Sequence, residues 1–289
     1  MHKLCPTCPE KIGESSTGGT MTSLSQTKPD PPHCRRINGW QCPWDVMQAL
    51  SWITIPLMCG VSILITLPLP HYPIVPILIG TFYGWNVLLV LILTSIDPAP
   101  PNTRHIRPAT FERNEHHQHV IEKGYCNVCK MTVAEGTKHC RQCNKCVPGY
   151  DHHCKWLNTC VGQRNYRYFV TLVVSLTLMA FLLFVILFIA IFFHIVRAVQ
   201  GHSEPFRYDG GVIILDSVSW TVVSVICILC YATVFGFTAH LLNFHFMLLR
   251  TGLTTISYIQ QKRQMQITNA GKPMTQRSIP TISANVPTV

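Results

Sequence analysis

The residues with the clearest capacity for chemistry lie between Cys126 and Cys160, where seven cysteines and three histidines fall within 35 positions. Eight of these ten residues form two sets with identical spacing, because adding 14 to each position of the first set gives the second. The first set is Cys126, Cys129, His139 and Cys146, and the second is Cys140, Cys143, His153 and Cys160. Three thiolates and one imidazole are the ligands of a closed tetrahedral zinc site. The spacing therefore predicts two interleaved structural Zn²⁺ ions.

Two candidate ligands, His152 and Cys154, remain after this assignment. A closed structural site has no open coordination position, so neither zinc ion is expected to activate water. With Asp151, the two leftover residues place a carboxylate, an imidazole and a thiol within four positions. An imidazole can take the proton of a thiol, and a carboxylate can orient the imidazole, as nucleophilic catalysis by cysteine requires. The alternative is that Cys154 is a spare thiol and His152 only supports a metal ligand.

Long segments without Asp, Glu, Lys or Arg flank this cysteine-rich region and must position it. They cover residues 46–96, 168–196 and 217–249. A membrane-spanning helix needs about 20 mostly apolar residues, so the first segment is long enough for two helices with a proline-rich turn between them. We expect transmembrane helices at about 46–69, 72–96, 169–196 and 217–249. The predicted fold class is an all-α integral membrane protein with four transmembrane helices and a double-zinc loop between helices 2 and 3.

The basic residues predict how these helices are oriented. Residues 97–168 carry 11 basic and 6 acidic side chains, whereas residues 197–216 carry 2 and 3. Positively charged flanks stay on the cytosolic side of a membrane. We therefore expect the zinc-binding catalytic domain, residues 97–168, and both ends of the chain to be cytosolic. The membrane region 169–249 contains the loop 197–216, which we expect to be luminal. The ends are an N-terminal tail, 1–45, largely disordered, and a C-terminal tail, 250–289.

Composition excludes several classes of protein. Only 12% of the residues are charged, against about 25% in a soluble domain, which argues against a soluble cytosolic enzyme. The net charge of +10 suits an anionic cytosolic leaflet, so no nucleic-acid partner is expected. Disulfides are disfavoured in a loop that faces the reducing cytosol.

The run Asp151-His152-His153-Cys154, in a cysteine-rich region between helices 2 and 3, resembles the DHHC protein S-acyltransferases, the palmitoyltransferases. The resemblance continues through Trp156, Asn158, Cys160-Val161-Gly162 and Asn165-Tyr166 to Phe169, and it covers nearly all of 97–260. It implies paired Cys3His zinc sites and a two-step reaction. Cys154 attacks the thioester of an acyl-CoA such as palmitoyl-CoA, with His152 as general base and Asp151 orienting it. The acyl group then passes to a cysteine thiol of a target protein.

The resemblance also implies partners and a location. Acyl-CoA, the lipid bilayer and membrane-associated proteins with cytosolic cysteines are the expected partners. The family expectation for location is an endomembrane, the endoplasmic reticulum or the Golgi. CoA phosphates need cations, and Lys138, Arg141, Lys145 and Lys155 are available, although a solvated basic face would use the same residues.

The sequence departs from the family pattern at three places. Asp97-Pro98-Ala99 replaces the usual Asp-Pro-Gly, and Lys155 replaces the usual Pro, as in one branch of the family. Thr254-Thr255-Ile256-Ser257 replaces Thr-Thr-x-Glu. The last departure motivates a second hypothesis, a membrane-anchored zinc scaffold or adaptor with little or no catalysis.

Overall fold

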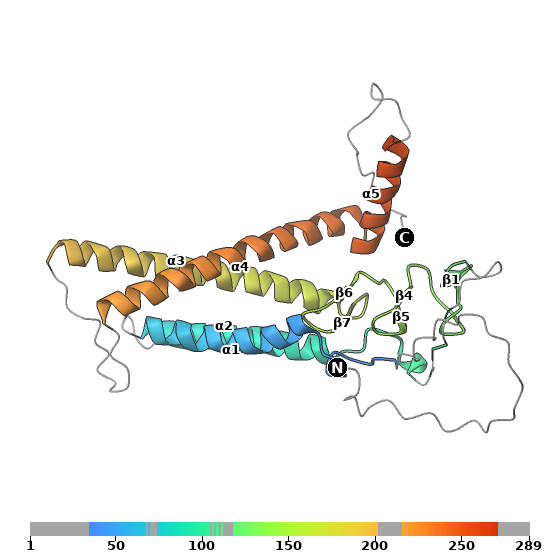
Figure 1. The fold of residues 1–289 in the computed structure, drawn as a ribbon, viewed down its shortest axis with the longest axis horizontal. Coiled ribbons are helices and arrows are strands. Elements are labelled where there is room, and N and C mark those ends of the chain that lie inside the picture. Colours follow the sequence, from blue (N-terminus) through green and yellow to red (C-terminus); the bar gives the residue numbers. More distant parts are fainter. Residues whose placement is uncertain are drawn as a thin grey trace, which may run out of the picture. The chain divides into compact units, whose positions relative to one another are not determined.

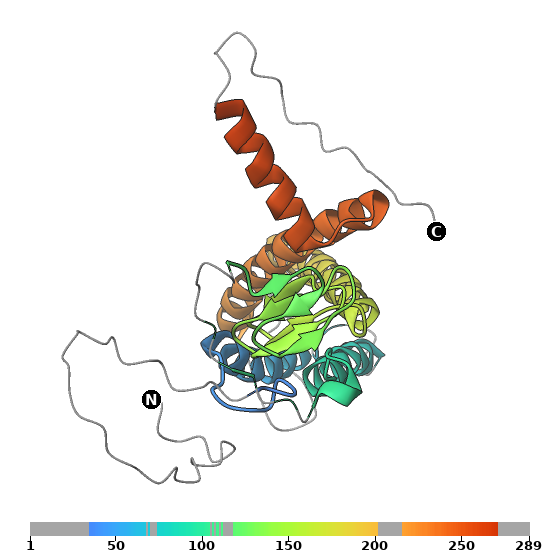
Figure 2. The same cartoon turned by 90° about the vertical axis from the view of Figure 1, so that its right-hand side faces the viewer.

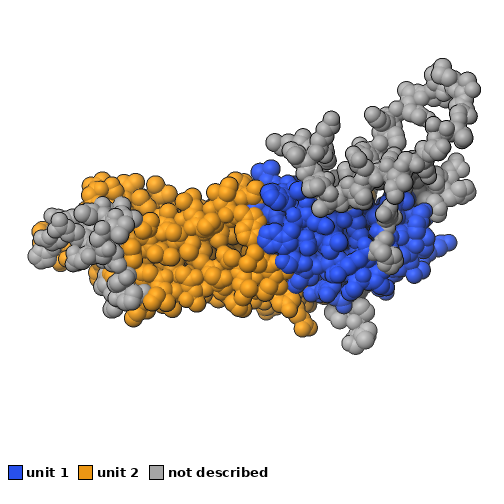
Figure 3. Space-filling model, turned by 90° about the horizontal axis from the view of Figure 1, so that it is seen from below, with its two compact units in different colours: residues 1–48, 94–164 blue, residues 49–93, 165–289 orange. Residues whose placement is uncertain are grey.

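The computed structural model describes residues 35–67, 69, 74–104, 106, 108–109, 111, 118–201 and 216–270. The chain forms two compact units, coloured separately in Figure 3. Unit 1 contains residues 1–48 and 94–164, and unit 2 contains residues 49–93 and 165–289. The expected disorder of 1–34, the C-terminal part 271–289 of the expected tail and most of the expected luminal loop fall outside the described residues.

Four long helices follow the charge-free segments (Figure 1). They are α1 (Val46–Thr66), α2 (Ile74–Ser95), α3 (Tyr166–Val199) and α4 (Ser217–Thr251). Each is long and apolar enough to cross a membrane. The four predicted spans are therefore confirmed, and α3 is three residues longer at each end than the charge pattern indicated.

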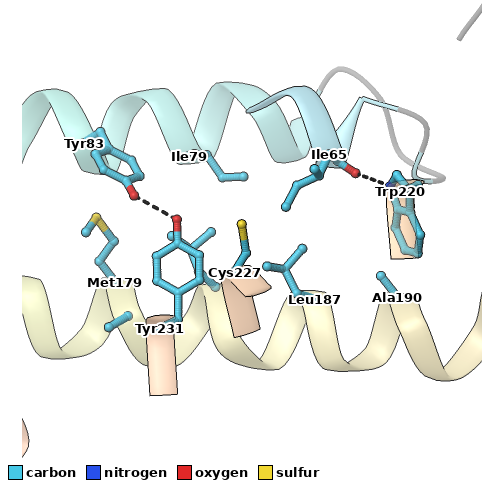
Figure 4. Close-up of a cluster of buried hydrophobic side chains, with 11 residues drawn as sticks. Ile65, Ile79, Tyr83, Met179, Leu187, Ala190, Trp220, Cys227 and Tyr231 are labelled. Atoms are coloured by element: carbon cyan, nitrogen blue, oxygen red, sulfur yellow. Dashed lines mark hydrogen bonds between the residues drawn. The ribbon is translucent and has the colours of Figure 1, made fainter. Parts of the chain in front are cut away.

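The helices of unit 2 are joined by polar contacts as well as by an apolar core (Figure 4). The hydroxyl of Tyr231 on α4 hydrogen bonds with Ser62 on α1 and, at 2.9 Å, with Tyr83 on α2. The indole Nε1 of Trp220 donates to the carbonyl of Ile65 at 2.9 Å. Inside a bilayer, polar groups must find such partners within the protein, so these bonds link α4 to α1 and α2.

A fifth helix, α5 (Thr255–Ala270), follows α4 and points away from it (Figure 2). Gly252, with φ of 65°, ends α4 in the left-handed conformation that glycine adopts readily. Thr254 then caps α5, because its Oγ1 accepts the N–H of Ser257 at 3.3 Å and bonds with the Ser257 hydroxyl at 2.9 Å. Ser257 thus supports the helix start at the position where the family pattern has Glu, in a segment that the sequence indicated only as a tail.

Unit 1 consists of short hairpins rather than helices. A three-stranded sheet contains β1 (Ile121–Glu122), β2 (Tyr125–Cys126) and β3 (Met131–Thr132). Two further antiparallel hairpins are β4 (Lys138–Cys140) with β5 (Lys145–Val147), and β6 (His152–Cys154) with β7 (Thr159–Val161). A single 3₁₀ turn, η1 (Pro101–Thr103), precedes them. Strands of two or three residues cannot build a large apolar core, so the stability of this unit depends on its cysteines and histidines. With five α-helices and only these short strands, the described part of the chain is mostly helical.

Candidate active site with two metal centres

Three hairpins of one design carry the cysteines, and we call their turns knuckles 1, 2 and 3. In each, a cysteine at the end of one strand pairs with the residue five positions later. The pairs are Cys126 with Met131, Cys140 with Lys145 and Cys154 with Thr159. Each turn also contains a non-glycine residue in the left-handed region, namely Lys130, Asn144 and Asn158, with φ between 50° and 53°. The turn that opens each 14-residue repeat therefore occurs three times, although the full ligand pattern occurs twice.

The two predicted Cys3His sets come together in the structure. In each set, the four ligand atoms lie within 4.8 Å of one another. Knuckle 1 supplies two cysteines of the first set and the β4–β5 hairpin supplies His139 and Cys146. Knuckle 2 supplies two cysteines of the second set and the β6–β7 hairpin supplies His153 and Cys160. Within the described residues, every cysteine of both sets is buried and none forms a disulfide.

The distances fit a zinc ion in each set. A tetrahedral ion with Zn–S of about 2.3 Å and Zn–N of about 2.1 Å places sulfur and nitrogen about 3.6 Å apart. The three Sγ atoms of the first set lie 3.4–3.8 Å from Nδ1 of His139. Those of the second set lie 3.3–3.7 Å from Nδ1 of His153. The geometry of both sets therefore matches the closed Cys3His zinc site that the sequence predicted.

Strand β6 separates the metal ligand from the candidate catalytic residues. Successive side chains of a strand point to opposite faces, so His153 faces the second metal set while His152 and Cys154 face the other side. In knuckle 3, Leu157 stands where knuckles 1 and 2 have their second cysteine. Cys154, which is 8% exposed, is thus a knuckle cysteine that belongs to neither metal set.

His152 is held by the carboxylate beside it. Its Nδ1 lies 2.7 Å from Oδ2 of Asp151, whose side chain is 1% exposed. Because Nδ1 is engaged with the carboxylate, Nε2 is the ring nitrogen left for the thiol of Cys154. Burial disfavours the charged imidazole, but hydrogen bonds with Asp151 and then Cys154 outweigh it and raise the pKa of His152 to about 9. The arrangement therefore favours the imidazolium that forms when His152 takes a proton from a neighbouring group.

One of the candidate phosphate-binding cations has a different role. Lys145 is fully buried, and its Nζ donates to Oδ1 of Asp97 at 2.9 Å and to the carbonyl of Ile37 at 2.7 Å. Arg104 lies 3.5 Å from the same carboxylate. The expectation that Lys145 is available to a phosphate is therefore wrong, because its ammonium group is buried and already paired with Asp97.

Sequence reasoning also missed the segment before α1. Residues 35–45, expected to belong to a tail, are ordered within unit 1, and their contacts converge on Asn158, four positions after Cys154. Arg36 is 8% exposed and Asn158 is 1% exposed. Continuing the 14-residue shift from Cys140 and Cys143 to Cys154 and Leu157 would have singled out knuckle 3, but no local signal marks Arg36.

Comparisons with known proteins agree with this site. The family model described as DHHC palmitoyltransferase matches residues 119–262. Human palmitoyltransferase ZDHHC11 is 34% identical over 187 residues, 62% of this chain and 45% of the relative. Mouse ZDHHC11 is 34% identical over 257 residues, 81% of this chain and 73% of the relative. Human ZDHHC1 is 35% identical over 250 residues, 80% of this chain and 52% of the relative. The chain thus spans about half the length of these human relatives.

Proposed function

Because this chain belongs to the DHHC palmitoyltransferase family, we propose that it is a protein S-acyltransferase. It transfers a long-chain acyl group, with palmitoyl as the first candidate, from acyl-CoA to cysteine thiols of membrane-associated proteins. One observation carries the proposal: the thiol of Cys154 stands outside two complete Cys3His sets and beside an imidazole held by a buried carboxylate. A metal-binding scaffold alone has no need of that arrangement.

The eight residues of the two sets hold structural zinc in this proposal, and Cys154, His152 and Asp151 are the catalytic residues. Zinc bound there cross-links successive hairpins and supplies folding free energy, on the order of 10 kcal/mol per site. Since both sets are complete with four protein ligands, the metals take no part in the acyl transfer.

The first step makes an acyl-enzyme. His152 accepts the proton of Cys154, and Asp151 stabilises the resulting imidazolium through Nδ1. The sulfur attacks the carbonyl carbon of the acyl-CoA thioester, a new C–S bond forms to Cys154, and the bond to the CoA sulfur breaks. The leaving CoA sulfur takes the proton from His152. The raised pKa of His152 suits this role, because the imidazole holds the proton until the leaving group needs it.

The second step repeats the chemistry with a protein thiol. His152 takes the proton of a target cysteine, whose sulfur attacks the acyl carbon on Cys154. The bond between Cys154 and the acyl group breaks, and the Cys154 sulfur recovers the proton from His152. The acyl group is then attached to the target, and the enzyme returns to its starting state.

The setting of the reaction follows from charge and family. The zinc-binding region and both ends of the chain face the cytosol, as the excess of Lys and Arg favours. The membrane in this proposal is the endoplasmic reticulum or the Golgi, and the Asp97-Pro98-Ala99 sequence supports a place in the branch of the family without the usual glycine. Lys138, Arg141 and Lys155 remain as cations for CoA phosphates, and no nucleic acid takes part.

The experiment supplies purified full-length protein with an alkyne analogue of palmitoyl-CoA and measures the protein adduct. We expect an adduct that hydroxylamine removes, because a thioester is cleaved by this nucleophile. Cys154→Ser should abolish the adduct, whereas Cys230→Ser, which changes an exposed cysteine of α4, should retain it. Both variants should keep the zinc content of the unmodified protein. Zinc-loaded protein that never forms the adduct would instead support the membrane-anchored scaffold.

A further inference from the structure

Knuckle 3 lacks the second cysteine that knuckles 1 and 2 contribute to a metal set. In knuckles 1 and 2, two cysteines on the same turn belong to one metal set, and a metal ion held there would cross-link the turn to the next hairpin. In knuckle 3, Leu157 replaces the second cysteine, yet Asn158 keeps the left-handed φ of 52° that the other two turns show at this position. Something other than zinc must therefore hold this turn, which carries Cys154.

The segment of residues 36–43, which we call the brace, contacts this turn through Asn158. The guanidinium of Arg36 donates from Nη1 to Oδ1 of Asn158 and to its carbonyl, the latter at 3.3 Å. The amide Nδ2 of Asn158 lies 3.2–3.4 Å from three brace carbonyls, those of Gly39, Gln41 and Pro43. Arg36 also donates from Nη2 to the carbonyl of Pro43 at 3.1 Å, which closes the brace around the Asn158 side chain.

Gly39 brings the brace backbone against the turn. A Cβ atom at this position would overlap the carbonyl oxygen of Leu157 and would lie 2.8 Å from Cγ2 of Thr94. The N–H of Gly39 donates to the carbonyl of Thr94 at 2.8 Å, so the backbone cannot move away without losing a hydrogen bond. The backbone N–H of Arg36 donates to the carbonyl of Cys143 in knuckle 2 at 2.9 Å. The brace is therefore fixed at one end to knuckle 2, whose cysteines belong to a metal set, and to knuckle 3 along its length.

We propose that the brace takes the place of a metal ion in knuckle 3. It holds the turn from Cys154 to Thr159 rigid while leaving the Cys154 sulfur without a metal and able to react. Arg36, Gly39 and Asn158 are positioning residues, because none of them touches the reacting atoms. The inference rests on the proposed acyl transfer for its effect on rate, whereas the rigidity of the turn is a property of the protein alone.

The test uses two brace variants of full-length protein that act by different means. Arg36→Ala removes the donors to Asn158, and Gly39→Ala inserts a methyl group against Leu157 without changing any charge. We expect the rate of adduct formation on Cys154 at saturating acyl-CoA to fall on the order of 10- to 100-fold, since a displacement of about 1 Å at a reacting atom can cost that much. The acyl-CoA concentration that gives half the maximal rate should not change. Arg36→Lys should recover part of the rate.

The matched controls are Gly60→Ala on α1, where an added Cβ meets nothing within 4 Å, and Arg263→Ala, which removes an exposed arginine of α5. Both should keep the unmodified rate. Hydrogen exchange measured by mass spectrometry gives a second readout that needs no acyl-CoA. The brace variants should speed exchange over residues 154–159 while exchange over 126–132 and the zinc content stay unchanged.

The outcomes separate the brace from the proposed function. Faster exchange confined to 154–159, with both zinc ions kept, supports the brace. Unchanged exchange and unchanged rate overturn it, and so does loss of zinc in both variants, because the segment would then support the whole unit. If the unmodified protein forms no adduct, acyl transfer is refuted, and the exchange comparison still decides whether the brace holds knuckle 3.

Discussion

The ion pair between Lys145 and Asp97 makes unit 1 depend on buried charges, and the mostly buried side chain of Arg35 lies 3.9 Å from the same carboxylate. The side chains of Lys145 and Asp97 are 0% and 1% exposed, and Nζ lies 2.9 Å from Oδ1. At this distance, with an effective dielectric constant of about 20, the attraction is about 6 kcal/mol before desolvation is counted. Removal of one partner of such a pair costs about 3–5 kcal/mol, because the other charge stays buried. We therefore expect Lys145→Met and Asp97→Asn each to destabilise the protein by about 3–5 kcal/mol.

Arg104→Met is the matched control, because it removes a cation from the same carboxylate. The Arg104 side chain is 52% exposed and lies 3.5 Å from Asp97, so its loss should cost about 0–1 kcal/mol. The double variant Lys145→Met with Asp97→Asn should be less destabilised than the sum of the single variants, by on the order of 1–3 kcal/mol.

The assay heats purified zinc-loaded protein in detergent micelles and follows zinc release with a chelating dye, which reports the opening of unit 1. The midpoint of release should fall on the order of 10 °C or more for Lys145→Met and by only a few degrees for Arg104→Met. Equal shifts for these two variants, or a shift of only a few degrees for both Lys145→Met and Asp97→Asn, would refute the reasoning from burial.

Three further predictions concern the catalytic pair, a metal set and the helix contacts. Asp151→Asn removes an interaction that raises the pKa of His152 to about 9, so the imidazole should lose its proton at lower pH. The alkaline decline in the rate of adduct formation should then move to lower pH in a pH–rate profile, and an unmoved decline would contradict the assignment. Cys129→Ser should reduce the zinc content by one ion per chain in elemental analysis, whereas loss of both ions would show that the sets do not fold separately. Tyr231→Phe removes the hydroxyl that joins α4 to α1 and α2, and it should cost about 0.6–2 kcal/mol in a thermal melt in detergent, with no change in melting as the contrary result.

The helices and the metal sets were predictable from sequence because each depends on a dominant, local constraint. A run of residues without charge that is longer than a bilayer leaves few alternatives to a membrane-spanning helix, and α1 begins at the predicted residue, Val46. A ligand set with the composition and spacing of a zinc site is similarly restrictive. By contrast, α5 is a mostly polar segment whose sequence lacks a strong apolar stripe, and its start depends on the cap formed by Thr254 and Ser257.

The brace and the buried ion pair depend on residues that are far apart in the chain. Arg36 and Asn158 are separated by 122 positions, and Lys145 and Asp97 by 48. Nothing near Lys145 in the sequence distinguishes it from exposed cations such as Lys155, so its burial could not be predicted. The position of knuckle 3 could be predicted, since the 14-residue shift continues from Cys140 and Cys143 to Cys154 and Leu157. Because Leu157 cannot bind a metal, the ligand pattern alone does not include this third turn.

The central claim is that the two metal sets use eight side chains and that the sulfur of Cys154 is not a metal ligand. Elemental analysis of zinc per chain in the unmodified protein and in Cys154→Ser tests this directly. The account predicts two zinc ions per chain in both proteins. A loss of one zinc ion in Cys154→Ser would contradict it, because that sulfur would then be a ligand and not a nucleophile.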